Sequence, residues 1–164
     1  MSIFMKYGHL RGESADAGHV GWVDVDEVYF HGVKRRISSN SGTRFDRESA
    51  VTEIRDITLI RYMDQASPGI FLESCCGDGK DLTLHYGKTT STGSGNDLFL
   101  EQVLEHAVIA DYKVYSSIYS RRRPSEKLTI SFTGLLLRYI PHGDDGTPLS
   151  PLAVSYSTRT NTTA

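Results

Sequence analysis

Alternation of apolar and polar residues runs through most of the chain and predicts β-strands. In SIFMKYG, Ile3, Met5 and Tyr7 would lie on one side of a strand, with Phe4 and Lys6 on the other. Further runs rich in Val, Ile, Thr, Tyr and Phe are separated by Gly, Ser, Asn and Asp, as is typical of strands and turns. These runs are HVGWVDVDEVYFHGV, TEIRDITLIRYM, KDLTLHYGK, LFLEQVLEHAVIADYKVYSS and EKLTISFTGLLLRYI. The pattern predicts a mainly β protein.

The segment DQASPGIFLESCCGDG breaks this alternation and predicts one short helix from Ser67 to Cys76. Ser67 is a candidate N-cap, Pro68 suits the first helical position, and Gly77 would end the helix. The side chains expected to share one face of the helix are Ile70, Phe71, Ser74 and Cys75. Farther along, LEQVLEH also has helical propensity, but the β-branched run after it favours a strand.

Composition is that of an ordinary globular protein. The chain has 164 residues, 38% hydrophobic and 23% charged, which is enough for one domain with a core. Its formal net charge of −2 does not indicate general binding to nucleic acid. No apolar run approaches the roughly 20 residues of a membrane helix, and the first residues lack the apolar stretch of a signal peptide. We therefore expect no membrane insertion and no cleaved leader.

The two cysteines, Cys75 and Cys76, are adjacent in the sequence. A disulfide between neighbours is strained, and the pair lacks the C-x-x-C spacing of zinc and redox motifs. The sequence therefore predicts free thiols that are buried or half-buried.

Two basic runs interrupt the strand pattern. The first opens KRRISSNSGTRFDRES, Lys34–Ser49, which has few residues for a core and is read as a long functional loop. The second is Arg121–Arg123. Aromatic residues interleaved with the cations would indicate nucleic-acid binding, but only Phe45 and Tyr119 lie nearby. A solvated loop or contact with an acidic protein surface is favoured instead.

The chain after Pro141 is rich in turn residues and contains one short apolar stretch, Leu152–Tyr156. This stretch would either add an edge strand or lie along a neighbouring subunit. We expect a domain at residues 1–141 followed by a partly ordered extension at residues 142–164.

The stretch GESADAGHVGW raises the question of catalysis, because Glu13, Asp16 and His19 are spaced by three residues. On a helix they would lie along one face and could bind a metal or perform acid–base chemistry. Gly18, Gly21 and the lack of apolar spacing argue against a helix, so a polar turn leading into a strand is favoured. The chain also lacks G-x-S-x-G and H-E-x-x-H motifs. We therefore expect no catalytic residues, no metal and no cofactor.

Taken in order along the chain, these motifs resemble the Hcp (haemolysin-coregulated protein) family of bacterial type VI secretion systems. The first motif is GES-x-D-x-x-H-x-GW. Its residues are Gly12, Glu13, Ser14, Asp16, His19, Gly21 and Trp22. VYFHGV, the basic loop, ITLIRYMDQASPGIF, LEHAVIADYKVYSS and PSEKLTISFTGLLLRYIP follow, so the resemblance covers residues 2–141. His31 and Gly69 depart from it, since Trp and a better helix former are commoner there.

The resemblance implies a fold and a function. Members form a compact β-barrel of two packed sheets with one short α-helix at the side. They assemble as hexameric rings that stack into a tube around an open channel. The tube carries a spike and is propelled by a contractile sheath, and some members hold effector proteins inside the ring. Such a protein assembles in the bacterial cytoplasm and is then secreted without a cleaved signal peptide. In this context GESADAGHVGW would be a structural turn, with Trp22 as a packing anchor.

Stacked rings require contacts between subunits, and Lys34–Ser49 is the segment we expect to supply them. Its basic residues are Lys34, Arg35, Arg36, Arg44 and Arg47. Candidate acidic partners are Glu13, Asp16, Asp24, Asp26 and Glu27. Two other functions stay open from the sequence. One is a monomeric β-sandwich module that binds a small ligand or carbohydrate, and the other is a metal-dependent hydrolase using the acid and histidine residues of the turn.

Overall fold

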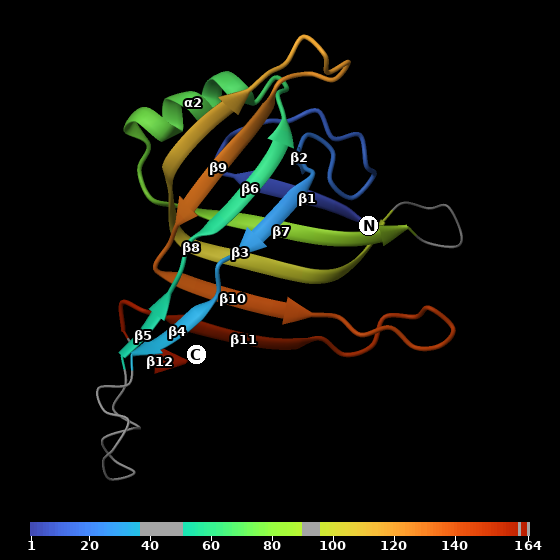
Figure 1. The fold of residues 1–164 in the computed structure, drawn as a ribbon. Helices are drawn as coiled ribbons and strands as arrows, with labels where there is room; N and C mark the ends of the chain where they lie inside the picture. The colour runs from blue at the N-terminus through green and yellow to red at the C-terminus, as the bar shows by residue number, and fades with distance from the viewer. Residues whose placement is uncertain (37–50, 90–95, 161, 164) are drawn as a thin grey trace.

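A computed structural model describes residues 1–36, 51–89, 96–160, 162 and 163 of the chain (Figure 1). Strands dominate it, in line with the sequence pattern. The elements are β1 (Ser2–Tyr7), β2 (Val23–Val25), β3 (Glu27–Phe30), β4 (Val33–Arg36), β5 (Val51–Ile54), β6 (Ile57–Tyr62), α2 (Ser67–Cys76), β7 (Lys80–Thr89), β8 (Asn96–Tyr115), β9 (Ser125–Ser131), β10 (Gly134–Tyr139), β11 (Leu152–Ser157) and β12 (Thr162–Thr163). Over the residues described, the expectation of a mainly β protein with one short helix is confirmed.

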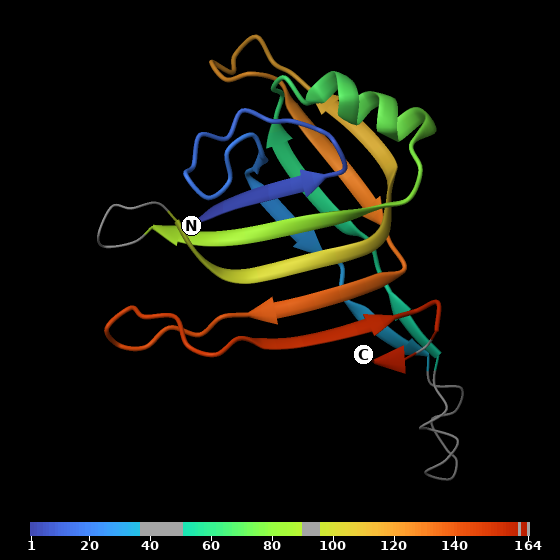
Figure 2. The same cartoon turned by 180° about the vertical axis from the view of Figure 1, so that it is seen from behind.

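The strands of the described residues pair antiparallel in one ten-stranded sheet and one two-stranded sheet. Along the larger sheet the order is β12-β11-β10-β8-β7-β1-β2, while β9 continues from β8 and leads to β6 and then β3. Strands β9, β6 and β3 cross the direction of β1, β7, β8 and β10 (Figures 1 and 2). The pairings among the described residues do not close this arrangement into a barrel.

Strand β8 connects the two layers because its two halves pair with different strands. Its first half pairs with β7 and β10, and its second half pairs with β9. His106 lies between the halves with φ of +50°, a left-handed conformation that is uncommon outside glycine and turns the chain. Strands β9 and β10, which the sequence suggests as one long run, are separated at Phe132–Thr133 because they belong to different layers.

The core lies between the layers and follows the alternation of the sequence. Buried side chains from the two directions of strands meet there. They include Met5, Tyr7, Leu82, Leu84 and Leu104 from β1, β7 and β8, and Leu59, Leu128 and Ile130 from β6 and β9. Apolar contact between the layers is the main force that holds them together.

Helix α2 has the bounds that the sequence predicts, but two details of that prediction are wrong. Ser67 is not the N-cap: the cap position is Ala66, and Ser67 Oγ instead accepts a hydrogen bond from the Asp64 backbone N–H at 3.0 Å. Asp64 Oδ1 in turn accepts from the Ala66 N–H at 2.8 Å, so Asp64 holds the turn that precedes the helix, while no side chain caps α2 itself. The buried face is also different, since Ile70 is fully buried and Phe71 is 55% exposed.

Gly69, in the first turn of α2, lies against the side chain of Leu10. A Cβ atom at this position would overlap the side chain of Leu10. A larger residue at position 69 therefore requires the Leu10 side chain to shift.

The prediction of buried or half-buried thiols is wrong in its burial. Cys75 and Cys76 are free, but both are exposed at the end of α2. The helix turns Ile70 and Glu73 toward the sheet, which leaves the final two residues on the outer side. The pattern of apolar residues in this ten-residue helix did not identify the face that packs against the sheet.

The basic segment and the C-terminal stretch both contain strands. Val33–Arg36 pairs with Val51–Ile54 as strands β4 and β5, so the expectation of a loop is wrong for Lys34, Arg35 and Arg36. Arg44 and Arg47 lie outside the described residues. Toward the C-terminus, β11 pairs along the whole of β10, and β12 pairs with the end of β11.

Candidate functional site

The segment from Gly12 to Trp22 is a turn that leads into β2, and its backbone is bonded to itself. Gly12 N–H donates to Gly21 O at 2.9 Å, and Ser14 N–H donates to Trp22 O at 3.1 Å. A Cβ atom on Gly12 would overlap the backbone of Trp22, and Gly21 has φ of +74°. Both glycines of the motif are therefore needed by the backbone rather than by chemistry.

His19 is the centre of this turn and is only 5% exposed. Its Nδ1 lies 2.7 Å from Asp16 Oδ2, and its ring stacks on Phe4 with centroids 4.1 Å apart. The hydrogen bond from His19 is the largest influence that holds the pKa of Asp16 below its ordinary value. Trp22 packs edge-on against the His19 ring at 5.0 Å.

A second histidine continues this arrangement onto the sheet. His19 Nε2 lies 2.9 Å from Nδ1 of His85 on β7, and His85 Nε2 lies 3.1 Å from Glu101 Oε1 on β8. Arg138 on β10 donates to the other oxygen of Glu101 at 3.0 Å. Burial is the main cause that lowers the pKa of His85. We refer to Asp16, His19, His85 and Glu101 as the histidine row.

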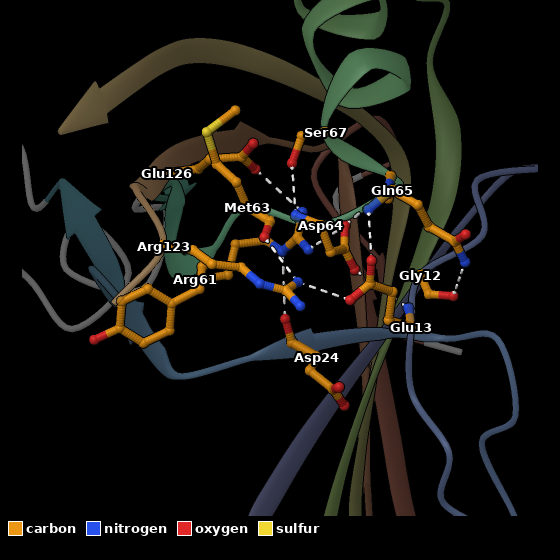
Figure 3. A network of polar contacts seen from close by, with 12 residues as sticks. Gly12, Glu13, Asp24, Arg61, Met63, Asp64, Gln65, Ser67, Arg123 and Glu126 are labelled. Carbon is orange, nitrogen blue, oxygen red and sulfur yellow. Dashed lines mark hydrogen bonds and ion pairs between the residues drawn. The ribbon is translucent and has the colours of Figure 1, made fainter. Parts of the chain in front are cut away.

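A buried arginine forms a separate network at the other side of the turn (Figure 3). Arg61 on β6 is 1% exposed, and its NH1 lies 3.1 Å from Oε2 of Glu126, which is fully buried. Its NH2 lies 2.5 Å from Asp64 Oδ1, and its Nε donates to Asp24 O at 3.3 Å. The guanidinium thus links β6, β9, β2 and the approach to α2 through one charged group.

Glu13 belongs to this second network and not to the histidine row. Its backbone N–H donates to Asp64 Oδ2 at 3.3 Å, and its Oε1 accepts from the Gln65 N–H at 3.3 Å. Arg123 NH1 donates to Glu13 Oε2 at 2.7 Å (Figure 3). The three-residue spacing therefore brings Asp16 and His19 together but directs Glu13 elsewhere. No cluster of three metal-ligating side chains occurs among the described residues.

A cavity of about 510 Å³ opens beside Arg61 and has charges of both signs on its walls. Its lining residues are Glu13, Asp24, Asp26, Arg61, Tyr62, Met63, Asp64, Arg121, Arg122 and Arg123. Arg122 lies over the Tyr62 ring at 5.4 Å and donates to its hydroxyl at 2.9 Å. The second basic run thus borders this charged cavity.

The predicted contact residues fall at separate places on the molecule. Lys34, Arg35 and Arg36 lie on the β4–β5 arm, and Arg36 forms an exposed ion pair with Glu53 at 3.1 Å. This arm is at the opposite end of the fold from the connection between β8 and β9 that carries Arg121–Arg123 (Figure 1). Of the candidate acidic partners, Asp16 is held by His19 with its side chain only 11% exposed, whereas Asp26 and Glu27 are exposed.

Comparison with known proteins places the chain in a family. The family model for the type VI secretion system effector Hcp matches residues 4–139. The chain belongs to the Hcp family. Hcp proteins are structural proteins of type VI secretion without catalytic activity. The sequence has no significant match among curated proteins.

Solved structures share the fold at low sequence identity. A type six secretion system protein has a TM-score of 0.85 and 17% identity, with 99% of each chain covered. Hcp1 from Salmonella typhimurium has a TM-score of 0.73 and 18% identity, covering 99% of this chain and 98% of that one. A type VI secretion system effector from Yersinia pestis has a TM-score of 0.65 and 18% identity, covering 94% and 98%. These similarities extend through the C-terminal strands.

Sequence reasoning missed several residues that organise the Hcp fold here. Arg61 lies on the same inward face of β6 as Ile57 and Leu59. Glu126 lies on the same inward face of β9 as Leu128 and Ile130. Opposite charges at inward positions of two strands are a signal for a buried ion pair.

The described part of the chain contains no helix long and apolar enough to cross a membrane.

Proposed function

We propose that this Hcp protein is a structural subunit of the type VI secretion inner tube, in which hexameric rings stack and are expelled with effector proteins. Family membership supports the assignment to type VI secretion. The division of the chain into residues 1–141 and an extension at 142–164 is part of the same proposal. Its partners would be further copies of itself, the spike protein, the contractile sheath and effectors. Assembly would take place in the bacterial cytoplasm before secretion without a cleaved signal peptide.

The observation that carries the stacking proposal is the separation of charged surfaces at two ends of one chain. The β4–β5 arm carries Lys34, Arg35 and Arg36 at one end of the fold, and the β8–β9 connection lies at the other end (Figure 1). That connection supplies Arg121–Arg123 to the charged cavity, whose acidic residues include Asp24 and Asp26. Surfaces at opposite ends of one chain cannot meet each other within that chain. A head-to-tail contact between copies brings them together and leaves an open end for the next copy.

A double substitution tests the role of the arm. We expect Arg35→Ala with Arg36→Ala to weaken stacking of rings and leave the fold intact, because an exposed ion pair contributes little to stability. The matched control is Lys113→Ala with Lys127→Ala, which also removes two positive charges from exposed, paired strands. Negative-stain images would record ring stacks and circular dichroism would record folding. Stacks of unchanged length in the arm variant would eliminate this contact.

One observation favours a different function, a monomeric module that binds a small ligand. An apolar groove of about 560 Å³ lies between the β4–β5 arm and strands β10 and β11. Its apolar lining residues are Phe30, Val33, Ile54, Leu135, Leu137 and Val154. Grooves of this size and polarity accommodate small molecules.

Electron microscopy of the purified protein separates the two functions. Six-fold rings with an open centre in top views are the result expected for a tube subunit. A uniform population of monomers that persists at high protein concentration would refute the tube proposal and leave the groove as the functional surface. A fluorescent apolar probe would then test the groove directly.

A further inference from the structure

The histidine row is a continuous line of polar groups that joins three separate parts of the fold. It begins on the turn with Asp16 and His19, passes to His85 on β7 and ends at Glu101 on β8. The three contacts along it measure 2.7, 2.9 and 3.1 Å between heavy atoms, each within hydrogen-bond range. A hydrogen bond needs one proton between its two heavy atoms. The number of protons on the two rings therefore determines how many of the three contacts are hydrogen bonds.

Both carboxylates at the ends of the row are surrounded by other donors. Asn96 Nδ2 donates to Asp16 Oδ1 at 2.9 Å, and the Gly18 N–H donates to Asp16 Oδ2 at 3.2 Å. Arg138 NH1 donates to Glu101 Oε2 at 3.0 Å. These donors favour the ionised carboxylates, which can only accept hydrogen bonds. Each imidazole must therefore supply an N–H to the carboxylate that it faces.

Two neutral imidazoles do not carry enough protons for all three contacts. Each neutral ring has one N–H, so two rings fill two contacts and leave the third with two facing lone pairs. Two imidazolium rings carry four protons, and their N–H groups would then oppose each other across the 2.9 Å contact between His19 and His85. Three protons on two rings fill every contact. One ring is then an imidazolium and the other is neutral.

We propose that His19 and His85 hold three ring protons at neutral pH, with His19 the imidazolium, and that a further proton on His85 releases the 12–22 turn from β7. His19 is the imidazolium because its contact with a carboxylate is the shorter one, 2.7 Å, which is the length typical of a charge-assisted hydrogen bond. His85 then accepts from His19 at Nδ1 and donates to Glu101 from Nε2. The hydrogen bond between His19 and His85 thereby holds the turn on the sheet, and its strength depends on pH. This holds whether or not the chain assembles into rings.

The charges around the two rings and the burial of His85 determine whether folding stability rises or falls with pH. Asp16 and Glu101 face the two rings from the turn and β8, and Arg138 on β10 binds the far oxygen of Glu101. Lys6 on β1 lies over the neighbouring Trp22 ring, 5.8 Å from its centroid. Burial is the largest influence on His85. Together with smaller contributions from His19 and Arg138 it outweighs the opposing effect of Glu101, so the pKa of His85 lies below its ordinary value of 6.5. The unfolded chain therefore binds a proton at His85 before the folded chain does. The contribution of the neutral His85 to folding stability is therefore present above about pH 6.5 and is lost as the pH falls below it.

Nitrogen NMR of the unmodified protein tests the proton count directly. At neutral pH we expect both ring nitrogens of His19 to carry protons, and His85 to carry a proton on Nε2 with Nδ1 bare. Two neutral rings, or a His85 with its proton on Nδ1, would overturn the proposal. This measurement needs no substitution and is unaffected if a variant fails to fold.

Fluorescence tests the release of the turn, because Trp22 is the single tryptophan of the chain. Its ring lies 5.0 Å from the His19 ring and 4.6 Å from the His85 ring. We expect one step in emission and greater acrylamide quenching as the pH falls, with a midpoint below about 6.5. His85→Gln should remove the step, since its amide can accept from His19 and donate to Glu101 but takes up no proton.

The matched control is His9→Gln, which alters an exposed histidine outside the row and should retain the step. Circular dichroism at each pH confirms that the sheet remains folded. A step that persists in His85→Gln, or its absence from the unmodified protein, would contradict the release.

Discussion

The buried ion pair between Arg61 and Glu126 offers the sharpest test of how this fold is held together. Arg61 is 1% exposed and Glu126 is fully buried, and Asp64, on the other side of the guanidinium, has a side chain only 7% exposed. The substitution Arg61→Met keeps the length and apolar volume but leaves both carboxylates without their cation. Removing one partner of a buried pair costs about 3–5 kcal/mol, because the remaining charge is uncompensated.

A double-mutant cycle separates the interaction between Arg61 and Glu126 from the other contributions to this loss of folding free energy. Glu126→Gln removes the charge but leaves an oxygen that accepts from Arg61, so we expect a loss of about 1.5–3 kcal/mol. The combined Arg61→Met and Glu126→Gln variant should be less destabilised than the sum of the two single changes, since one uncompensated charge is gone. The excess of the sum over the double variant measures the interaction between the two side chains.

Urea unfolding at a fixed protein concentration is the assay, repeated at a second concentration because assembly would add apparent stability. Arg123→Met is the control, since Arg123 also binds a carboxylate, that of Glu13, but with 62% of its side chain exposed. It should alter stability little. Equal losses for Arg61→Met and the control, or strict additivity in the cycle, would refute the account of a buried network.

Three further outcomes are expected. Gly69→Ala should lower the thermal midpoint, because its methyl group would overlap Leu10, and Leu10→Ala should recover part of the loss in the same scan. Burial raises the pKa of Tyr86 to about 12, so the unfolded chain ionises near pH 10 and the folded chain does not. Stability should therefore fall as the pH rises from about 10, and Tyr86→Phe should abolish that part of the fall in alkaline urea titrations. Cys75 and Cys76 should both react with a thiol reagent in the native state, and protection of either would contradict their exposure.

Local sequence patterns were sufficient for most of the elements. The alternation in SIFMKYG and KDLTLHYGK corresponds to β1 and β7, whose apolar residues face the core. Pro68 and Gly77 bracket α2 because their backbone preferences act over one or two residues. Such signals depend on neighbours in the chain and can be read without knowledge of the fold.

The boundaries between layers could not be predicted in this way. The run EKLTISFTGLLLRYI reads as one strand, yet its two halves pair in different layers, as β9 and β10. β8 is continuous in both the sequence pattern and the structure, but it changes partners near His106. Strand partners are distant in sequence, so the alternation that predicts a strand does not identify its neighbour.

In the candidate site, too, contacts between residues close in sequence could be predicted and contacts between distant residues could not. Within GESADAGHVGW the glycines and the lack of apolar spacing are enough to favour a turn, and Asp16 meets His19 inside that turn. Glu13, three residues earlier, is instead held by Arg123, which is distant in sequence, and His19 meets His85 on another strand. The sequence alone determined most of the strands, the helix bounds and the resemblance to Hcp proteins, because those depend on local order. Tertiary structure alone decided which charges are buried together, since that depends on which strands the packing of the core brings side by side.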